Sequence, residues 1–336
     1  MKLKIAFAGF RHGHIMGLYK KAQDSAGLEI VAACEEDEAT RLELQAGKNV
    51  EITHSNIDQM LATVPCDIVA VGDYYSKRGS ILIRSLKAGK HVIADKPICT
   101  CLDELAEIEK LAADKNLQVG CQLDLRSNLN ICGAKEIIKT GVLGEIHAIK
   151  FGGQHPLLQD SRPGWYFEDG KHGGTINDIA IHGIDIIPWM TGLIPQEVTA
   201  ARTWNALATN CPQFNDGAQF MFKMTNGCGV MGDVSYFAPD SCGFQLPYYW
   251  RFTIWGSKGV LEFNINEPVL KLAVNGSSGI SQLVPPVKAG PDYLNEFIGA
   301  INGKKVDLNT KAVITAARRA LTIQKAADQS LYSIQL

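Results

Sequence analysis

The 336-residue sequence lacks the features that would mark a membrane or nucleic-acid-binding protein. No unbroken apolar run reaches the roughly 18 residues that a membrane-spanning helix requires. The 33 Lys and Arg residues nearly balance the 35 Asp and Glu residues, so the net charge is −2. No basic run offers the positive charge that attracts a nucleic-acid backbone. We therefore expect neither a membrane nor a nucleic acid as a partner.

Cysteine is also scarce, because nine cysteines in 336 residues are too few for a disulfide scaffold. Their odd number, and the lack of a secretory apolar segment before the first glycine turn, predict a reducing, cytoplasmic location. Apolar residues make up 46% of the chain, which excludes intrinsic disorder, and the length predicts about two domains.

Short apolar segments in the first third of the chain alternate with segments of helical periodicity. The strands are expected at residues 4–8, 30–34, 67–71, 91–94 and 118–121, with a brief extra strand at 51–53. Helical periodicity is clearest at 81–86 and 102–115. This alternation is typical of a parallel, doubly wound sheet covered on both faces, so we predict an α/β fold.

The pattern changes after about residue 122, where a helix is expected at 175–191. Segments rich in β-formers, separated by turn signals, follow at 197–204, 217–224, 230–236, 249–255 and 259–263. Strands joined in this way favour an antiparallel sheet, and a last helix is expected at 311–329. We therefore predict two domains, at 1–121 and 122–336, the second of the α+β class.

A glycine turn, Gly9-Phe10-Arg11-His12-Gly13, follows the first predicted strand and opens a helix. Backbone N–H groups and the positive helix end stabilise a dinucleotide diphosphate at such a turn. The segment departs from the G-x-G-x-x-G pattern, because an arginine and a histidine stand at the second and third glycine positions. The alternative is a turn that connects strand and helix and binds nothing.

Four consecutive acidic residues, 35–38, end the second predicted strand. A carboxylate at this strand end commonly accepts the ribose hydroxyls of NAD, and we expect Glu35 in that role. Four carboxylates would also repel a 2′-phosphate, so NAD is favoured over NADP. The alternative is that these acids stabilise the N-terminus of the following helix.

Two later segments resemble motifs of the Gfo/Idh/MocA oxidoreductases. Residues 88–97, AGKHVIADKP, resemble the family's GKHV…EKP segment, with aspartate in place of the usual glutamate. Residues 173–185, GGTINDIAIHGID, resemble its GG…D…H…D helix. Together with WYF at 165–167 and WGSKG at 255–259, the resemblance extends over nearly the whole chain.

The resemblance implies an NAD-binding Rossmann domain at 1–121 and a substrate-binding and oligomerisation domain at 122–336. The second domain is expected to carry a large open, mostly antiparallel sheet that forms the interface of a homodimer or homotetramer. The family's pattern also implies that Lys96 and His182 face the nicotinamide and the substrate, with Asp178 beside them.

One segment departs from the family's pattern. A TPN..H sequence is common in this family after the fourth strand, whereas residues 73–78 read DYYSKR here. We expect Asp73 and Tyr74 to contact the cofactor in its place. The bond between Lys96 and Pro97 is commonly cis in this family, and Lys96 is expected among the cofactor contacts as well.

Hydride transfer to or from a carbinol carbon requires a proton to leave or reach its oxygen, and histidine titrates near neutral pH. We therefore expect His182 to act as the acid or base. Asp178, four residues earlier on the helix, would orient it, and Lys96 would hold the substrate oxygen. The alternative for Asp178 and His182 is an ion pair at a helix surface.

Four further residues are weaker candidates for substrate contacts, and they are Arg126, His155, Trp165 and Tyr166. Arg126 suits either an anionic substrate group or a surface salt bridge. Neither the Cys99-Thr100-Cys101 segment nor the histidines show metal-ligand spacing, so we expect no metal.

The sequence and the resemblance together predict an NAD-dependent dehydrogenase or reductase. Its expected substrate is a CH–OH group of a sugar, sugar acid, cyclitol or related polyol. Two alternatives stay open. One is an NAD-dependent glycosidase of the same superfamily, in which transient oxidation labilises a neighbouring bond. The other is a non-catalytic protein that senses NAD or a sugar.

Overall fold

The computed structural model describes residues 2–47, 49–285, 290 and 292–330, which form two compact units. The first unit contains Met1–Leu123, Pro163–Gly173 and Tyr293–Arg318, and the second contains Asp124–Arg162, Gly174–Asp292 and Arg319–Leu336. Two stretches beyond residue 122 therefore pack with the first unit. The division into domains at residue 121 stays a prediction. In the described part of the chain, no helix is long and apolar enough to cross a membrane.

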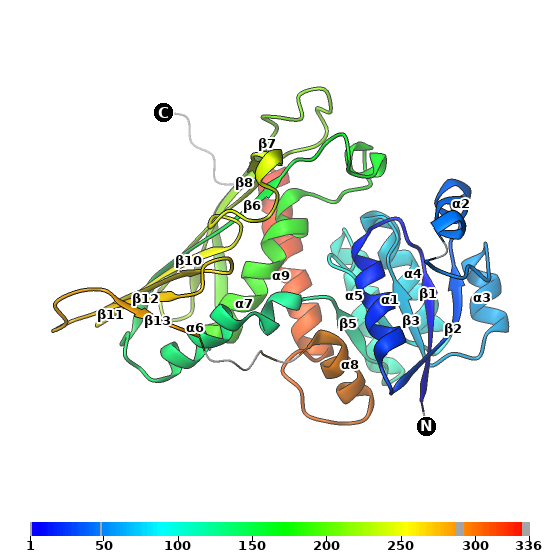
Figure 1. Ribbon diagram of the computed structural model, residues 1–336, viewed down its shortest axis with the longest axis horizontal. Helices are drawn as coiled ribbons and strands as arrows, with labels where there is room; N and C mark the ends of the chain where they lie inside the picture. Colours follow the sequence, from blue (N-terminus) through cyan, green and yellow to red (C-terminus); the bar gives the residue numbers. More distant parts are fainter. Residues whose placement is uncertain (1, 48, 286–289, 291, 331–336) are drawn as a thin grey trace. The chain divides into compact units, whose positions relative to one another are not determined.

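The first unit is built on a five-stranded parallel sheet in the order β2-β1-β3-β4-β5 (Figure 1). Its strands are β1 (Leu3–Ala8), β2 (Leu28–Cys34), β3 (Ile68–Val71), β4 (His91–Ala94) and β5 (Val119–Cys121). The strand order reverses at β1, because β2 and β3 lie on its two sides. Doubly wound sheets bind ligands beside such a point, at the carboxyl ends of the strands.

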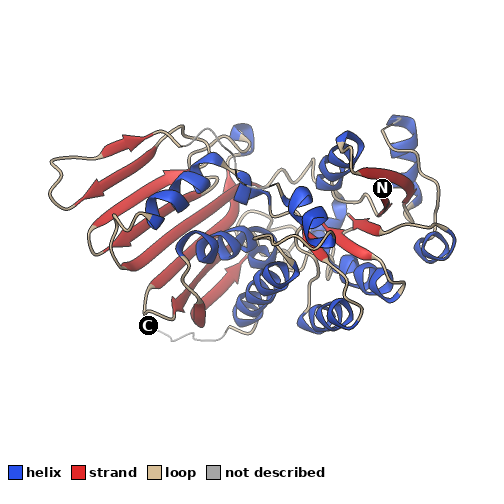
Figure 2. Cartoon of the chain, turned by 90° about the horizontal axis from the view of Figure 1, so that it is seen from below, coloured by secondary structure: helices blue, strands red, loops and turns tan. Residues whose placement is uncertain are grey.

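Helices connect these strands and cover both faces of the sheet (Figure 2). They are α1 (His14–Asp24), α2 (Glu38–Gly47), α3 (Ile57–Thr63), α4 (Tyr75–Lys87) and α5 (Leu102–Asp114), with α8 (Tyr293–Ile301) against β5. The predicted parallel, doubly wound sheet is thus confirmed. The expected extra strand at 51–53 is wrong, because these residues form no strand and the following residue, His54, makes only an isolated bridge with Cys34.

The second unit contains an eight-stranded sheet in the order β13-β12-β11-β10-β6-β9-β8-β7. Its strands are β6 (Ile146–Pro156), β7 (Pro195–Trp204), β8 (Gly217–Met224), β9 (Gly229–Ala238), β10 (Arg251–Gly256), β11 (Gly259–Asn264), β12 (Leu270–Val274) and β13 (Ser281–Leu283). Neighbouring strands are antiparallel except for the parallel pair of β6 and β9, which confirms a mostly antiparallel sheet.

The helices of this unit are α6 (Leu129–Lys139), α7 (Ile181–Thr191) and the last part of α9 (Thr310–Asp328), which begins in the first unit. A π-helical turn, η3 (Ile176–Ala180), runs directly into α7. The predicted helix at 175–191 is therefore a π-helical turn followed by an α-helix.

Phenylalanine rings fill one face of the large sheet and fix the position of α7. The rings of Phe151 on β6 and Phe252 on β10 stack 6.1 Å apart. A Cβ on Gly183 of α7 would lie 2.3 Å from the Phe151 ring, so α7 approaches the sheet closely only because this residue is glycine. The close approach of Gly183 therefore also brings the neighbouring His182 close to this sheet.

The opposite face of the sheet leaves large apolar side chains exposed in the described chain. Met221 on β8 is 43% exposed, Met231 on β9 is 44% exposed and Trp255 on β10 is 53% exposed. Single exposed apolar residues are ordinary, but three on one face of the sheet, on β8, β9 and β10, form an apolar surface.

Candidate cofactor and active site

The glycine turn crosses the carboxyl ends of the strands in the first unit. Gly9 has a φ of +82°, and a Cβ there would lie 2.7 Å from the Cβ of Asp73, so glycine is required. The N–H of Gly9 donates to the Cys34 carbonyl at the end of β2, and the N–H of His12 donates to the Gly72 carbonyl after β3. The turn therefore lies at the point where the strand order reverses.

The open side of the turn can accommodate a ligand. A Cβ built on Gly13, the N-cap of α1, would meet no atom within 4 Å. Since glycine has no side chain, the N-cap residue itself does not occupy the N–H groups of the helix N-terminus. Such a terminus attracts anions through its N–H groups and its dipole. The turn thus fits the diphosphate of a dinucleotide.

Glu35 lies directly behind this turn. Its carboxylate is fully buried and accepts hydrogen bonds from the N–H of Phe10 at 2.6 Å and of Asp37 at 2.8 Å. Burial raises the pKa of Glu35, against the effect of these two hydrogen bonds. The residue therefore braces the turn, and its role as ribose ligand stays a prediction.

Positive side chains gather around Tyr74, which precedes α4. Cations of Lys171, Arg11 and Lys77 lie 5.1, 5.8 and 5.8 Å from the centre of its ring. Lys77 also pairs with Asp73 at 3.0 Å, while Arg11 pairs at 3.2 Å with an acid of the 35–38 run. The segment that departs from the family's pattern thus presents an aromatic ring among cations beside the turn.

Lys96 follows β4 in a segment that a buried arginine shapes. Arg78 of α4 is fully buried and donates to the carbonyls of Asp73, Asp95, Lys96 and Pro97 at 2.7, 3.0, 2.7 and 3.0 Å. The Lys96–Pro97 bond is cis, as expected. Sequence reasoning missed Arg78, because an arginine on an amphipathic helix gives no signal of burial.

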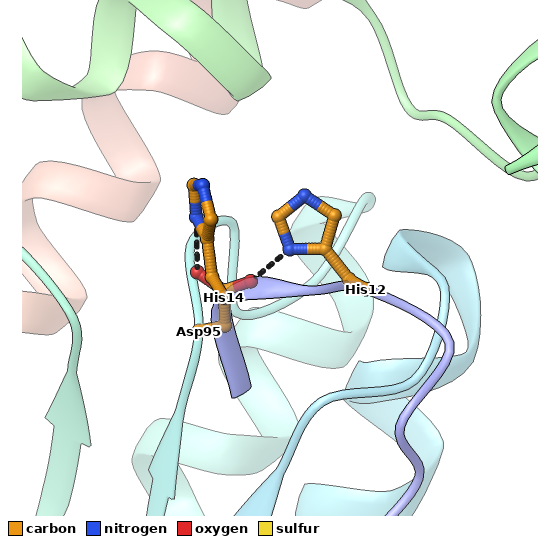
Figure 3. A group of neighbouring side chains, drawn as sticks. All are labelled: His12, His14 and Asp95. Carbon is orange, nitrogen blue, oxygen red and sulfur yellow. Dashed lines mark hydrogen bonds and ion pairs between the residues drawn. The ribbon is translucent and has the colours of Figure 1, made fainter. Parts of the chain in front are cut away.

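Two histidines turn their rings toward the carboxylate of Asp95 (Figure 3). His12 Nδ1 contacts Asp95 Oδ2, and His14 Nδ1 lies 3.4 Å from Asp95 Oδ1. Burial opposes ionisation of Asp95, but His12 and Arg78 hold its pKa well below the usual value. Burial lowers the pKa of His12 to about 4, although Asp95 acts in the opposite direction.

The same three side chains are the described group whose ligand atoms are close enough to hold a metal ion, since they lie within 4.8 Å of one another. The guanidinium of Arg78, however, lies 3.1 Å from Asp95 Oδ2. A positive charge at that distance disfavours a second cation on the same carboxylate. The expectation that no metal binds stays a prediction.

The segment 163–173 attaches to the glycine turn within the first unit. Trp165 Nε1 donates to the Arg11 carbonyl at 3.0 Å, and the Tyr166 hydroxyl lies 2.9 Å from His12 Nε2. Trp165 and Tyr166 were expected as substrate contacts, which no observation tests. Their observed contacts are with the turn predicted to bind the cofactor.

In the second unit, Asp178 and His182 stand on either side of the junction between η3 and α7. Both are buried, at 3% and 7% exposure. The Tyr236 hydroxyl of β9 donates to Asp178, and the His182 ring packs edge-on against Trp250 at 5.4 Å. Because both side chains are buried, the alternative of an ion pair at a helix surface is wrong. Single π-helical turns are frequent at functional sites.

The paired glycines before this helix have a structural cause. Gly174 has a φ of +93°, and a Cβ there would lie 2.2 Å from the side chain of Gln324 on α9. The Gln324 carbonyl accepts from the N–H groups of Ile176 and Asn177 at 2.9 and 3.3 Å. Gln324 thus caps the start of the helix that carries Asp178.

His155 of β6 lies within an aromatic cluster of the second unit. Its ring centre is 4.8 Å from that of Tyr249 and 5.7 Å from those of Phe244 and Trp250. Burial raises the pKa of Tyr249 to about 12, and the charge of Asp124 adds to this effect. Sequence reasoning predicted His155 but missed Tyr236, Tyr249 and Trp250, because aromatic residues in or beside strands are equally typical of a core.

Arg126 forms a buried ion pair rather than a surface one. Its Nε and Nη2 donate to the two carboxylate oxygens of Asp185 at 2.8 and 2.5 Å, and both side chains are about 95% buried. The guanidinium also lies 5.4 Å from the Trp189 ring. Arg126 therefore holds α7 from the segment before α6, and its contact with substrate stays a prediction.

All nine predicted cofactor residues lie in the first unit, and the predicted acid or base lies with its partner in the second. The first group is Gly9, Phe10, Arg11, His12, Gly13, Glu35, Asp73, Tyr74 and Lys96. The second group is Arg126, His155, Asp178 and His182. The shared action of Lys96 and His182 on one substrate stays a prediction, because the two residues belong to different units.

A doubly wound sheet with a glycine turn at its switch point, followed by a large open sheet, defines a two-domain dinucleotide-binding protein. Residues 3–123 match the family model described as "Oxidoreductase family, NAD-binding Rossmann fold", and residues 132–262 match the "GFO/IDH/MocA C-terminal domain". The chain belongs to the Gfo/Idh/MocA family of oxidoreductases, and its first domain is an NAD-binding Rossmann domain.

Three similar proteins illustrate the family. An uncharacterised oxidoreductase of Schizosaccharomyces pombe is 29% identical over 51% of this chain and 46% of its own length. The 2,7-anhydro-N-acetylneuraminate hydratase of Escherichia coli is 24% identical over 79% of this chain and 68% of its own. A solved levoglucosan dehydrogenase, in complex with NADH and levoglucosan, has 20% identity and a TM-score of 0.79 over 98% of both chains.

The matched segments of the first curated relatives cover about half of their length, 46% and 55%. The likeness to the levoglucosan dehydrogenase structure shows a shared fold.

Proposed function

We propose that the protein is an NAD-dependent oxidoreductase that transfers a hydride between nicotinamide and a carbinol carbon of a sugar, sugar acid, cyclitol or related polyol. The observation that carries the proposal is the glycine turn at the switch point together with Lys96, which follows strand β4 of the same parallel sheet. The family provides the dinucleotide, and the levoglucosan dehydrogenase relative supports a sugar substrate.

The N–H groups of the glycine turn and the start of α1 hold the diphosphate, and the acids at the end of β2 exclude a 2′-phosphate. Bound NAD supplies the hydride acceptor. Lys96 donates a hydrogen bond to the substrate oxygen and stabilises its negative charge. His182 takes the hydroxyl proton during oxidation, and Asp178, itself held by Tyr236, orients the histidine.

A second candidate is an NAD-dependent reaction with no net oxidation, such as hydration or glycoside cleavage. The similarity to a hydratase over 79% of this chain favours it. In such a reaction the same residues remove a proton and later return it, and the hydride passes to NAD and back, so NAD is regenerated. The sensing alternative requires binding of NAD with no turnover.

The test is an assay of the purified protein with NAD and a panel of sugars, sugar acids and cyclitols, followed both by NADH absorbance and by product analysis. Formation of NADH with an oxidised product supports the dehydrogenase. Product without net NADH supports the second candidate. Binding of NADH without conversion of any panel member contradicts both catalytic proposals.

We also expect the exposed face of the large sheet to pair with a second copy of the chain in a homodimer or homotetramer. The exposed apolar side chains Met221, Met231 and Trp255 on one face of this sheet support this expectation.

A further inference from the structure

His12 links three separate segments of the first unit, although the proposed chemistry gives its side chain no role. The imidazole is 6% exposed. Its Nδ1 contacts Asp95 at the end of β4, and its Nε2 lies 2.9 Å from the hydroxyl of Tyr166 and 3.2 Å from that of Tyr75. The ring therefore contacts the strand end before Lys96, the first turn of α4 and the segment 163–173.

The order of protons in this network follows from the charges. Arg78 and His12 keep Asp95 ionised, so the carboxylate only accepts and Nδ1 of His12 carries the proton. Burial keeps the ring neutral, with a pKa of about 4, so Nε2 accepts. The Tyr166 hydroxyl then donates to Nε2, and its oxygen accepts from the Tyr75 hydroxyl at 2.6 Å.

Two further hydrogen bonds hold the segment 163–173 in place. Trp165 Nε1 donates to the carbonyl of Arg11, one residue before His12. The N–H of Ser76 in α4 donates to the Lys171 carbonyl at 3.1 Å. The segment 163–173 is thus anchored at both ends to elements that surround the glycine turn.

We propose that His12 is a positioning residue for the nicotinamide dinucleotide. Through Asp95 and Tyr166 it holds the glycine turn, the strand end that carries Lys96 and the segment 163–173 in the arrangement that binds the cofactor. The inference rests on the proposed function, because it requires the dinucleotide to bind at this turn. It adds Asp95, Tyr75 and Tyr166 as residues that act through the turn.

The test is titration of the full-length protein with NADH, followed by fluorescence. In His12→Asn the amide nitrogen still faces Asp95, but the acceptor for Tyr166 is lost. Tyr166→Phe removes the same hydrogen bond from its other end. We expect each variant to weaken NADH binding about tenfold, and the double variant to bind no more weakly than Tyr166→Phe, because both single variants remove the hydrogen bond between His12 and Tyr166.

The matched control is Tyr19→Phe, which removes the hydroxyl of another tyrosine of the same unit that packs against Phe7 and lies outside the network. We expect its NADH affinity to stay within twofold of the wild type. Steady-state assays should show a higher KM for NAD in His12→Asn with a smaller change in kcat. Loss of folding alone would lower the melting temperature without this pattern.

Two results contradict the inference while wild-type protein binds NADH. One is normal affinity in both His12→Asn and Tyr166→Phe. The other is an additive loss of about a hundredfold in the double variant. If His12→Asn does not fold, Tyr166→Phe and Tyr75→Phe provide the same comparison. Failure of the wild type to bind NADH instead contradicts the proposed function.

Discussion

The two units hold their predicted site residues by different means. In the first, backbone groups position most of them, through a glycine turn, three strand ends and the carbonyls that Arg78 binds. In the second, side chains position them, since Tyr236 donates to Asp178 and His182 packs against Trp250. A dinucleotide is a constant ligand that backbone geometry can recognise, whereas substrates differ and require side chains that vary.

The sharpest test of this contrast compares two variants. His182→Ala should lower kcat a thousandfold or more, because it removes the proposed acid or base, and should leave NADH affinity within twofold. Gly9→Ala should abolish NADH binding, because the new Cβ would lie 2.7 Å from Asp73. Turnover kinetics and fluorescence titration measure both effects. Near-normal turnover of His182→Ala would contradict its assignment.

A second prediction concerns acid stability of the first unit. The pKa of His12 is about 4 in the folded protein, below its ordinary value of 6.5. The unfolded chain therefore binds a proton at higher pH than the folded chain does. The contribution of neutral His12 to the free energy of unfolding is therefore fully present above pH 6.5 and is lost as the pH falls from 6.5 to 4. The total loss over this interval is about 3 kcal/mol.

Urea unfolding at pH 7.5 and pH 5 measures this effect. Wild-type protein should lose about 2 kcal/mol of unfolding free energy over that interval through His12. Asparagine does not titrate in this range, so the loss of unfolding free energy in His12→Asn should be smaller than that of the wild type by about 2 kcal/mol. An equal loss in both proteins would show that His12 titrates normally.

A smaller effect is expected from Tyr236→Phe in the second unit. The variant removes the hydroxyl that donates to Asp178 and leaves the buried ring in place. We expect kcat to fall about tenfold with the KM for NAD unchanged, since one hydrogen bond to a carboxylate is lost. A changed KM for NAD with a normal kcat would contradict the role of Tyr236 in holding Asp178 for catalysis.

The smallest effect on folding is expected at the exposed sheet face. Met231→Lys should change the unfolding free energy by about 0.5 kcal/mol or less, because the residue is exposed. It should nevertheless weaken association between copies of the chain. Sedimentation velocity at several protein concentrations measures the change, and an unaltered oligomer would exclude this face as the interface.

The same contrast explains what the sequence could predict. Buried parallel strands have continuous apolar runs, and the turn needs glycine at Gly9, so the first sheet and its switch point could be predicted from the residues alone. The segment at 51–53 misled this reasoning, because three residues compatible with a strand carry no information about a pairing partner.

The second unit was predicted less completely. The junction of η3 and α7 could not be foreseen, because a π-helical turn differs from an α-helix by a single residue and shares its apolar pattern. Contacts such as that of Arg126 with Asp185 join residues distant in the sequence, which periodicity does not relate. Arg78 of the first unit was missed for another reason, because an arginine on an amphipathic helix gives no signal of its burial.

The discontinuity of the first unit decides how the chain can be divided experimentally. Phe297 of α8 packs so closely on β5 that a Cβ on Gly120 would lie 2.7 Å from its ring, and the Val119 N–H donates to Thr310. A fragment that stops at residue 121 would lose these partners and expose apolar surface at an edge strand. A stable nucleotide-binding fragment therefore needs the C-terminal stretch joined back to it, as if the second unit were an insertion that can be excised.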